Sequence, residues 1–304
     1  MPATVGGELG AAPASSAQLL EVAVEAARTA GSFLLDGRGH ARSIDTKSSS
    51  TDMVSEMDRQ AEALIRAVIA KRRPADAVLG EEGGAGGAQL GGAQLGGAGG
   101  ADHPEGGGVR WVVDPLDGTT NFLYGFPVWA VSVAAERGGT VVAGAVLDPG
   151  RDELWTAVPG GGARCNGDRL QPLVDRGGLD TALVATGFAY RAERREAQGR
   201  VVGHLLPRIR DIRRSGSAAL DLCWLAAGRV DAYYEEGTWI WDWAAGALVA
   251  REAGAWVGGF DGGPPSGRGV LAARPTLAAE LRALLSEADA GASLRPGRSV
   301  PPPS

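Results

Sequence analysis

The run WVVDPLDGTTNF, from Trp111 to Phe122, joins an apolar segment to a polar segment that is rich in turn formers. Its first three residues are aromatic or β-branched and precede a proline, which is typical of a buried strand that ends in a turn. Asp114 and Asp117 would then place two carboxylates on one tight turn. Pro115 removes an N–H group and fixes φ, so the Leu116 carbonyl would offer a further hard oxygen. The run therefore outlines a cation site.

The next three residues, Gly118, Thr119 and Thr120, have little side-chain bulk. Their backbone N–H groups could face an anion where the chain enters a helical turn, so a metal and a phosphate would meet at one place. The alternative is structural, because Asp-Pro and Asp-Gly are ordinary turn dipeptides and either threonine can cap a helix. The run alone would favour that alternative, so the rest of the chain has to supply support for the cation site.

Further acids follow apolar elements elsewhere in the chain. Glu81 and Glu82 end one predicted strand, Glu235 ends another, and Asp242 precedes a helix of small residues. Each has an ordinary explanation, since glutamates at a strand end are usually solvated and Asp242 is a suitable N-cap. Small residues would also let that helix approach a sheet and aim Asp242 inward. Glu81 and Asp242, together with the two aspartates of the central run, could supply a two-cation site for phosphate chemistry.

The chain of 304 residues can bury a large core, either as one domain or as two closely packed halves. Its hydrophobic content of 44%, its charged content of 22% and its net charge of −6 fit a globular protein without a basic field for nucleic acid. No apolar run suits a signal sequence or a membrane span, so we expect a cytoplasmic protein without membrane contacts. Cys165 and Cys223 lack metal-site or disulfide spacing and are interpreted as structural thiols.

The pattern predicts alternating helices and strands. Helices are expected over 17–36, from a capping box of Ser55 and Asp58 onward, over 192–206, after Ser217, over 244–253 and over 276–285. Strands are expected over 77–79, 127–135, 140–147, 153–158, 184–186, 231–235 and 269–272. Residues 1–16 and 288–304 are expected to be disordered, and the Gly-rich segment 83–108 to be a flexible insertion. The folded part, 17–287, would divide into two halves near residue 180.

The run DPLDGTTNF resembles the metal-binding signature of the inositol monophosphatase family of Mg²⁺-dependent small-molecule phosphatases. Other stretches resemble the family's further motifs in the same order: KSSSTDMVSEMD, GEE, SGSAALDL, YYEEG and WDWAAGALVAREAGAW. The resemblance covers residues 17–287 apart from the Gly-rich insertion. It implies an α+β fold of layered αβαβα type with mixed sheets, a homodimer, and inhibition by lithium.

The resemblance implies a ligand set for two or three Mg²⁺ ions. Glu81, Asp114 and the Leu116 carbonyl would hold one ion, while Asp114, Asp117 and Asp242 would hold a second. All of these ligands are oxygen atoms, which is the preference of Mg²⁺.

Roles in catalysis and substrate binding are implied in the same way. Thr119, oriented by Asp58, would position and help to deprotonate the attacking water, and Glu81 would be a further catalytic carboxylate. A structural alternative for Asp58 is a first-turn carboxylate that complements the helix dipole, and one side chain could do both. The substrate-binding positions that the resemblance implies are Asp117, Gly118, Thr119, Gly216, Ser217, Ala218, Glu235 and Asp242. For several of these, helix capping or exposure to solvent is the structural alternative.

Within the superfamily, DGTTNF and YYEEG favour a phosphatase that converts myo-inositol 1-phosphate, a small phosphorylated polyol, to inositol and phosphate. One alternative is a phosphatase for histidinol phosphate or another small monoester. The other is a regulatory binding protein on a phosphatase scaffold, whose mark would be a missing ligand, and none is missing in this sequence. Trp239 departs from the family pattern and adds an aromatic side chain near the expected pocket.

Overall fold

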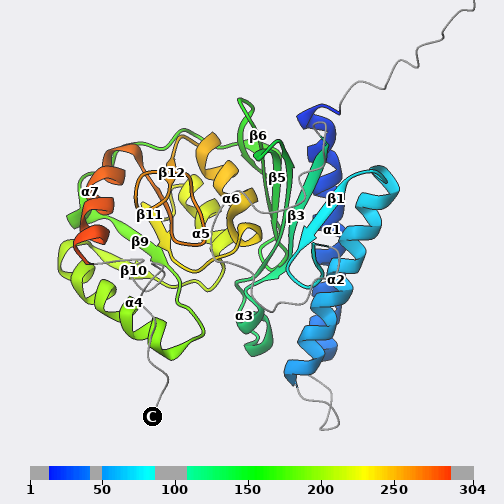
Figure 1. Cartoon of the computed structure of the whole chain (residues 1–304), viewed down its shortest axis with the longest axis horizontal. Coiled ribbons are helices and arrows are strands. Elements are labelled where there is room, and N and C mark those ends of the chain that lie inside the picture. Colours follow the sequence, from blue (N-terminus) through cyan, green and yellow to red (C-terminus); the bar gives the residue numbers. More distant parts are fainter. Residues whose placement is uncertain (1–13, 42–49, 86–107, 289–304) are drawn as a thin grey trace, which may run out of the picture.

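The computed structural model describes residues 14–41, 50–85 and 108–288, which form five layers of helices and sheets (Figure 1). In order across the molecule these are the helices α1 (Ser16–Ala41) and α2 (Ser50–Arg72), a first sheet, the helices α5 (Ala218–Ala226) and α6 (Ile240–Glu252), a second sheet, and the helices α4 (Ala192–Leu205) and α7 (Pro275–Glu287). The predicted αβαβα sandwich of the α+β class is confirmed.

The first sheet has eight described strands in the order β2-β1-β3-β4-β5-β6-β7-β8. They are β1 (Ala77–Gly80), β2 (Gly84–Ala85), β3 (Val109–Asp117), β4 (Ala130–Arg137), β5 (Thr140–Asp148), β6 (Glu153–Val158), β7 (Gly162–Cys165) and β8 (Asp168–Arg169). β1 and β3 are parallel, and the other neighbours are antiparallel. β4 and β5 form the predicted hairpin, whose turn residues Gly138 and Gly139 both have positive φ.

The second sheet has the order β10-β9-β11-β13-β12 in the described chain. Its strands are β9 (Leu183–Thr186), β10 (Asp211–Arg213), β11 (Ala232–Glu235), β12 (Trp256–Gly258) and β13 (Val270–Ala273). β9 is parallel to both of its neighbours, while β13 is antiparallel to both of its own, so this sheet is also mixed. The sequence pattern did not predict β10 and β12, because three-residue strands are too short to show a period.

Helix α1 buries a different stripe from the one that its bulkiest residues suggest. Its fully buried positions include Leu19, Ala26, Ala30 and Leu34, which recur at helical spacing, whereas Leu35 is 46% exposed. Leu35 therefore points away from the sheet although it is a large apolar residue. Alanines face the sheet because their small side chains let the helix lie close to it.

Helix α2 begins at Ser50, earlier than predicted. The proposed capping box of Ser55 and Asp58 is therefore wrong, because both residues lie inside the helix and not at its first turn. Asp58 is also no first-turn carboxylate; it is a buried side chain with 3% exposure on the face that packs beneath the first sheet. Local sequence could not exclude an earlier start, since the preceding polar residues are compatible with either a loop or a helix.

The central helix α6 packs against the first sheet at very short range. A Cβ atom at Gly144 on β5 would lie 3.1 Å from the Cα atom of Ala245, and one at Gly246 would lie 3.0 Å from the Ala219 carbonyl oxygen of α5. The predicted close approach of the small-residue helix to the sheet is therefore observed. This packing fixes α6 between the two sheets, where its N-terminal end carries Asp242.

Some predicted features lie outside the described residues. These are Lys47, most of the Gly-rich segment 83–108, and nearly all of the two terminal segments. The first residues of that segment, Gly84 and Ala85, are described and form β2, which was not predicted.

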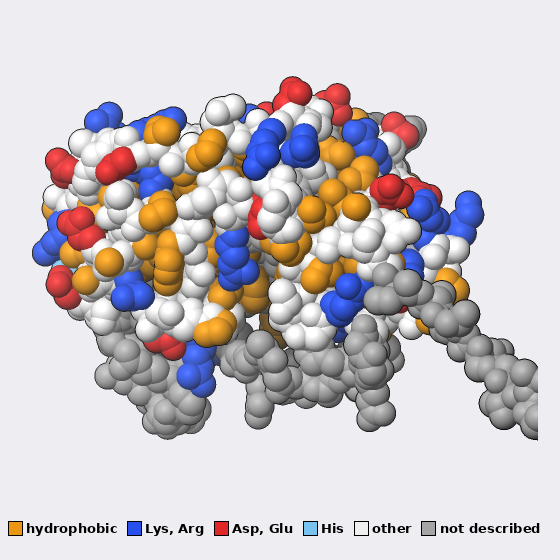
Figure 2. Space-filling model, turned by 90° about the horizontal axis from the view of Figure 1, so that it is seen from above, with side chains coloured by type: hydrophobic (Ala, Val, Ile, Leu, Met, Phe, Trp, Pro, Cys, Tyr) orange, Lys and Arg blue, Asp and Glu red, His pale blue; other side chains and the backbone are white. Residues whose placement is uncertain are grey.

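In the described residues, no helix combines the length and the apolar character needed to cross a bilayer. Acidic and basic side chains are interspersed on the face shown in Figure 2, so that face offers no continuous basic surface.

We expect Gly144→Ala to lower the free energy of unfolding by about 1–3 kcal/mol, because the added methyl group meets backbone atoms of α6 that cannot move independently. The matched control is Gly199→Ala inside α4, where a Cβ atom would meet nothing within 4 Å. That change should stabilise by about 0.5–1 kcal/mol through helix propensity. Urea unfolding measures both, and equal effects would contradict the close packing of α6 on β5.

Candidate active site

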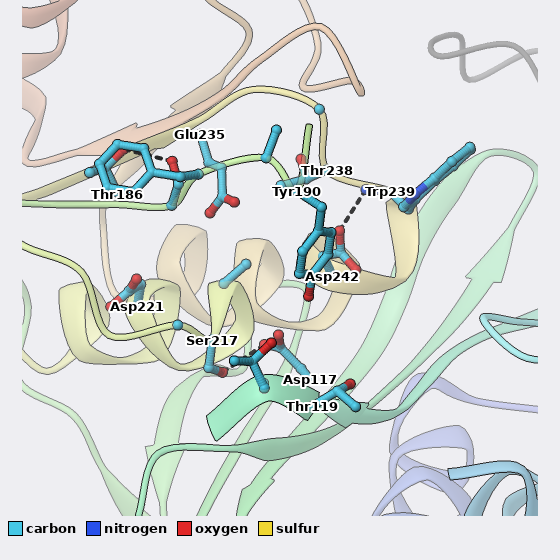
Figure 3. Close-up of a pocket in the computed structure, with 18 of the residues that line it drawn as sticks. Asp117, Thr119, Thr186, Tyr190, Ser217, Asp221, Glu235, Thr238, Trp239 and Asp242 are labelled. Carbon is cyan, nitrogen blue, oxygen red and sulfur yellow. Dashed lines mark hydrogen bonds between the residues drawn. The ribbon is translucent and has the colours of Figure 1, made fainter. Parts of the chain in front are cut away.

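A polar pocket of about 310 Å³ opens where the end of β3, the loop after β9 and the N-terminal ends of α5 and α6 come together (Figure 3). The structure brings nearly all of the predicted site residues to it. They are Glu81, Asp114, Leu116, Asp117, Gly118, Thr119, Gly216, Ser217, Ala218, Glu235 and Asp242. Asp58 is the exception, because it does not line the pocket wall.

The two aspartates of the central run share one face of the sheet because β3 contains a bulge. β3 does not stop at Val113 as predicted but continues to Asp117, with a register shift between Asp114 and Asp117. Asp114 pairs with Ser132 and Asp117 with Ala130, two positions on the same face of β4. Without the extra residue, Asp117 would point to the opposite face. The predicted tight turn was wrong in form, but the two carboxylates do converge.

The bulge also separates the two parts of Leu116. Its side chain is fully buried in the core formed with α1 and α2, while its carbonyl oxygen accepts a 3.0 Å hydrogen bond from the Thr119 hydroxyl group. Its N–H group donates to Asp114 Oδ1 at 2.9 Å. The carbonyl therefore stays beside the carboxylates of the pocket.

Asp117 is attached to the second half of the chain. Its Oδ2 atom accepts hydrogen bonds from the Ser217 hydroxyl at 2.6 Å and from the Ala219 N–H at 2.8 Å. Ser217 is the predicted N-cap of α5, since its oxygen also accepts from the Leu220 N–H at 3.2 Å. The cap thus fixes both the helix and the carboxylate.

Two glycines allow the central run and the segment before α5 to lie close together. Gly118 has φ 96°, and a Cβ atom there would lie 3.0 Å from the Val128 carbonyl oxygen and 3.2 Å from that of Gly216. Gly216 itself has φ 95°. The Asn121 amide group donates to the carbonyl oxygens of Val128 and Ser215 at 2.7 and 2.8 Å, so it links the central run to the segment before α5. We did not identify Asn121 as important from the sequence.

Asp242 is the third residue of α6. The prediction that it is the N-cap was wrong. The N-cap is Trp239, whose N–H group donates to Asp242 Oδ2 at 2.6 Å. In Figure 3 this bond is drawn from Trp239 to Asp242, beside Tyr190. The Trp239 ring stacks on that of Trp241, with centroids 5.3 Å apart, and lines the pocket as expected.

The predicted contact between Asp58 and Thr119 is absent among the described residues. Thr119 donates to Leu116 instead, and Asp58 Oδ1 is buried without a hydrogen-bond partner. Burial raises the pKa of Asp58 to about 9, and repulsion from Glu81 and Glu82 adds to the shift. The electrostatic interactions of Asp58 are therefore with Glu81 and its neighbours, and not with Thr119.

The pocket carboxylates also have raised pKa values. Burial raises the pKa of Glu81 to about 7 and that of Asp117 to about 6, although hydrogen bonds from Ser217 and the α5 backbone oppose the shift of Asp117. Burial raises the pKa values of Asp114 and Asp242 well above the ordinary range, with repulsion from Glu81 and from Asp117, respectively, as the next cause. Ionisation of these carboxyl groups is therefore energetically unfavourable in the free protein.

This donor set suits a hard divalent cation, because it consists of carboxylate and carbonyl oxygens without histidine or cysteine. In the described part of the chain, however, no three acidic, histidine or cysteine side chains already form a closed coordination group. Three carboxylate oxygens of the set, Asp114 Oδ1, Asp117 Oδ2 and Asp242 Oδ2, accept hydrogen bonds from protein donors. The remaining oxygens fit Mg²⁺, which keeps several waters and needs few protein ligands.

The opposite wall carries polar groups from the second half of the chain. Glu235 accepts a 3.0 Å hydrogen bond from the Tyr233 hydroxyl, and burial raises the pKa of Glu235 to about 7. A Cβ atom at Gly187 would lie 2.1 Å from the Glu235 carboxylate, so any other residue there would have to displace the Glu235 side chain. Glu235, at the end of β11, therefore faces the pocket and does not extend into solvent as strand-end glutamates usually do.

Sequence reasoning missed several lining residues. Asp221 and Thr238 are buried and each has one side-chain oxygen without a hydrogen-bond partner, while Tyr190 is 83% exposed at the pocket mouth. Arg194 also lines the pocket. The only available signal was their place near matched motifs, because single polar residues in a helix or loop have no period.

A model of the inositol monophosphatase family matches residues 15–290. The chain belongs to the inositol monophosphatase family. This membership makes it a phosphatase, as the sequence predicts.

Relatives within the family carry two kinds of name. The inositol-1-monophosphatase SuhB of Mycobacterium tuberculosis is 45% identical over 260 residues, which is 82% of each chain. The Nus factor SuhB of Vibrio cholerae is 41% identical over 249 residues, covering 81% of this chain and 86% of that relative.

Solved structures of family members share the fold. The SuhB structure from Mycobacterium tuberculosis has a TM-score of 0.73 at 40% identity and covers 91% of this chain and 98% of its own. Inositol monophosphatase II from Staphylococcus aureus has a TM-score of 0.75 at 27% identity and covers 93% and 99%, respectively.

In the presence of a chelator, we expect the melting temperature to fall as the pH rises from about 6 to 9. Folded carboxyls with raised pKa values bind more protons than the unfolded chain does, so their contribution to stability is lost as the pH rises through the folded values. Asp58→Asn should flatten the decline above pH 7, because a neutral side chain has no proton to lose.

The matched control for this measurement is Asp211→Asn. Asp211 is exposed, and its hydrogen bond with Arg213 lowers its pKa, so it is already ionised throughout the pH range used. An unchanged slope in Asp58→Asn, or a melting temperature that rises with pH, would contradict the electrostatics of the site.

Proposed function

We propose that this chain hydrolyses phosphate monoesters of small polyols in a Mg²⁺-dependent reaction, with myo-inositol 1-phosphate as its substrate. The observation that carries this proposal is the convergence of four carboxylates from three chain segments on one pocket, whose opposite wall offers the buried Glu235 carboxylate to hydroxyl groups. A phosphate group would occupy the acidic end and the polyol the other.

The metal ligands of the proposal are those that the family resemblance implies. Glu81, Asp114 and the Leu116 carbonyl would hold one Mg²⁺, and Asp114, Asp117 and Asp242 a second, with two or three ions in total. Bound Mg²⁺ supplies a water of lowered pKa and stabilises charge on the phosphate and on the leaving oxygen.

The chain itself orients the reacting groups. Thr119 donates to the Leu116 carbonyl, so the lone pairs of its hydroxyl oxygen remain available to accept a hydrogen bond from the attacking water. Gly118 lies at the entry to α3 (Thr119–Tyr124), where its positive φ turns the backbone toward the pocket. Asp58 would support the Glu81 side of the site from its buried position on α2, because it forms no hydrogen bond to Thr119 in the described residues.

Recognition of the polyol is assigned to the second half of the chain. Glu235, held by the Tyr233 hydroxyl, would accept hydrogen bonds from substrate hydroxyl groups. Gly216, Ser217 and Ala218 line the pocket between Glu235 and the acidic end. Their backbone would limit the size of the bound ring.

Two relatives named Nus factor SuhB, from Vibrio cholerae and Escherichia coli, are 41% and 40% identical to this chain and support the regulatory alternative. The complete acidic set in this chain favours catalysis. For the histidinol-phosphate alternative, a panel of small monoesters, each assayed for phosphate release, distinguishes the substrates.

We expect phosphate release to stop after exhaustive chelation and to return when Mg²⁺ is added, because the site contains only oxygen ligands. Lithium should inhibit by competing at one ion position, as the family resemblance implies. Full activity in a chelator would refute the metal-dependent mechanism. Absence of phosphate release from every monoester, with Mg²⁺ present and the fold intact, would favour the regulatory role.

Comparison of Asp114→Asn with Glu235→Gln separates chemistry from recognition. Asp114 is proposed to contact both ions, so its change should lower kcat/KM to a similar extent for inositol 1-phosphate and for an aryl phosphate. Glu235→Gln should cost about 1–3 kcal/mol with inositol 1-phosphate and little with the aryl phosphate, because only the polyol offers hydroxyl groups. Equal losses on both substrates in Glu235→Gln would remove that residue from recognition.

A further inference from the structure

Glu62 is a buried carboxylate that the proposed mechanism does not use. It lies on α2, one helical turn after Asp58, and is 3% exposed. Its position is beneath the end of β1, where the chain leaves the sheet and carries Glu81 into the pocket. A buried charge in such a place needs partners, and these partners show what it does.

The carboxylate of Glu62 accepts hydrogen bonds from the two amides that directly follow Glu81. The Glu82 N–H donates to Oε2 at 2.8 Å and the Gly83 N–H to Oε1 at 3.1 Å. Arg66, one turn further along α2, donates from Nε to Glu62 Oε1 at 2.7 Å and from Nη1 to the Val78 carbonyl oxygen at 3.2 Å. Helix α2 therefore holds both β1 and the turn after it.

The approach is so close that it requires glycine on both sides of the turn. A Cβ atom at Gly80 would lie 2.4 Å from Glu62 Oε2, and one at Gly83 would lie 2.7 Å from Oε1. The GEEG sequence thus wraps around the Glu62 carboxylate, with the Glu81 side chain directed to the pocket. A side chain at Gly80 or Gly83 would collide with the Glu62 carboxylate.

Glu81 needs such an anchor more than the other acids do. Asp114 and Asp117 lie in the nine-residue strand β3, and Asp242 lies in the thirteen-residue helix α6. Glu81 instead lies on a turn between the four residues of β1 and the two residues of β2. A short turn has few ladder bonds to hold a side chain against the repulsion of its neighbours.

We propose that Glu62 is a positioning residue, which fixes Glu81 at the acidic end of the pocket by binding the amides of Glu82 and Gly83, while Arg66 holds Glu62 in place. This rests on the proposed function in one respect, namely that Glu81 is a Mg²⁺ ligand. The binding of the turn by Glu62 is independent of that function.

Two variants of Glu62 test the role. Glu62→Ala leaves both amides without a partner, and Glu62→Gln can accept from only one of them, because its NH₂ group faces the other. The Mg²⁺ concentration that half-saturates the rise in melting temperature, measured without substrate, should increase by about 10-fold or more in Glu62→Ala and by less in Glu62→Gln. Amide exchange of a peptide spanning 79–85, followed by mass spectrometry, should accelerate in the same order.

The control is Glu56→Gln on the same helix. Glu56 forms an exposed pair with Arg59 at 2.8 Å, so its change removes an equal charge from α2 without touching the turn. It should leave both the Mg²⁺ response and the exchange of 79–85 unchanged. A merely structural role for Glu62 would lower the melting temperature but leave the Mg²⁺ half-saturation at the wild-type value.

Gly80→Ala tests the same contact without the Glu62→Ala change, and a double-mutant cycle then compares the two substitutions. Gly80→Ala in the wild-type protein forces a methyl group against the Glu62 carboxylate and should reproduce the Mg²⁺ defect. In the Glu62→Ala protein the carboxylate is gone, so Gly80→Ala should add little further loss. Additive losses would overturn the direct contact between Gly80 and Glu62 as the cause.

The outcomes separate this inference from the proposed function. An equal loss of Mg²⁺ affinity in Glu62→Ala and Glu62→Gln, with unchanged exchange of 79–85, would overturn positioning, because it would mean that only the negative charge of Glu62 matters to the ion. Unchanged Mg²⁺ binding with unchanged exchange would overturn it as well. A wild-type protein whose stability does not respond to Mg²⁺ would overturn the proposed function and the role of Glu62 toward the ion, while accelerated exchange would still establish that Glu62 anchors the turn.

Discussion

The pocket depends on holding several carboxylates of like charge close together in a partly buried space. Burial raises the pKa values of Glu81, Asp114, Asp117 and Asp242, and repulsion between neighbouring acids adds to the shift for all of them except Asp117, which means that their ionised forms oppose folding. Hydrogen bonds from protein donors, and the positive charge of Arg214 near Asp117, offset part of this cost. A bound divalent cation would offset the rest, so the repulsion that weakens the free protein would also be the source of affinity for the ion.

Each acid is fixed by a different local device, and these devices connect the layers of the fold. A bulge in β3 turns Asp117 to the same face as Asp114, and the N-cap of α5 binds Asp117 from the second half of the chain. Asp242 is fixed by the first turn of α6, which lies close to β5 because glycine and alanine meet there. The site therefore requires both sheets and the helices between them.

The sequence predicted much of this arrangement because the evidence was local. The Ser217 cap and the hairpin glycines each have a short-range signature that tertiary contacts did not change, and the spacing of the acids in DPLDG predicted two convergent carboxylates. The predictions that were wrong concerned boundaries and orientation. α2 starts at Ser50, β3 continues to Asp117 and Asp242 is the third residue of its helix, and each of these outcomes depends on strand pairing or packing. Buried partners that are distant in sequence, such as Glu62 beneath the GEEG turn, leave no periodic signal at all.

The most direct test of the central claim is anomalous scattering from crystals soaked in Mn²⁺, which accepts the same oxygen ligands as Mg²⁺. At least two anomalous peaks are expected in the pocket. One should lie between Glu81, Asp114 and the Leu116 carbonyl, and the other between Asp114, Asp117 and Asp242. An intact crystal without a peak among these residues, from protein that still hydrolyses phosphate esters in a chelator, would contradict it.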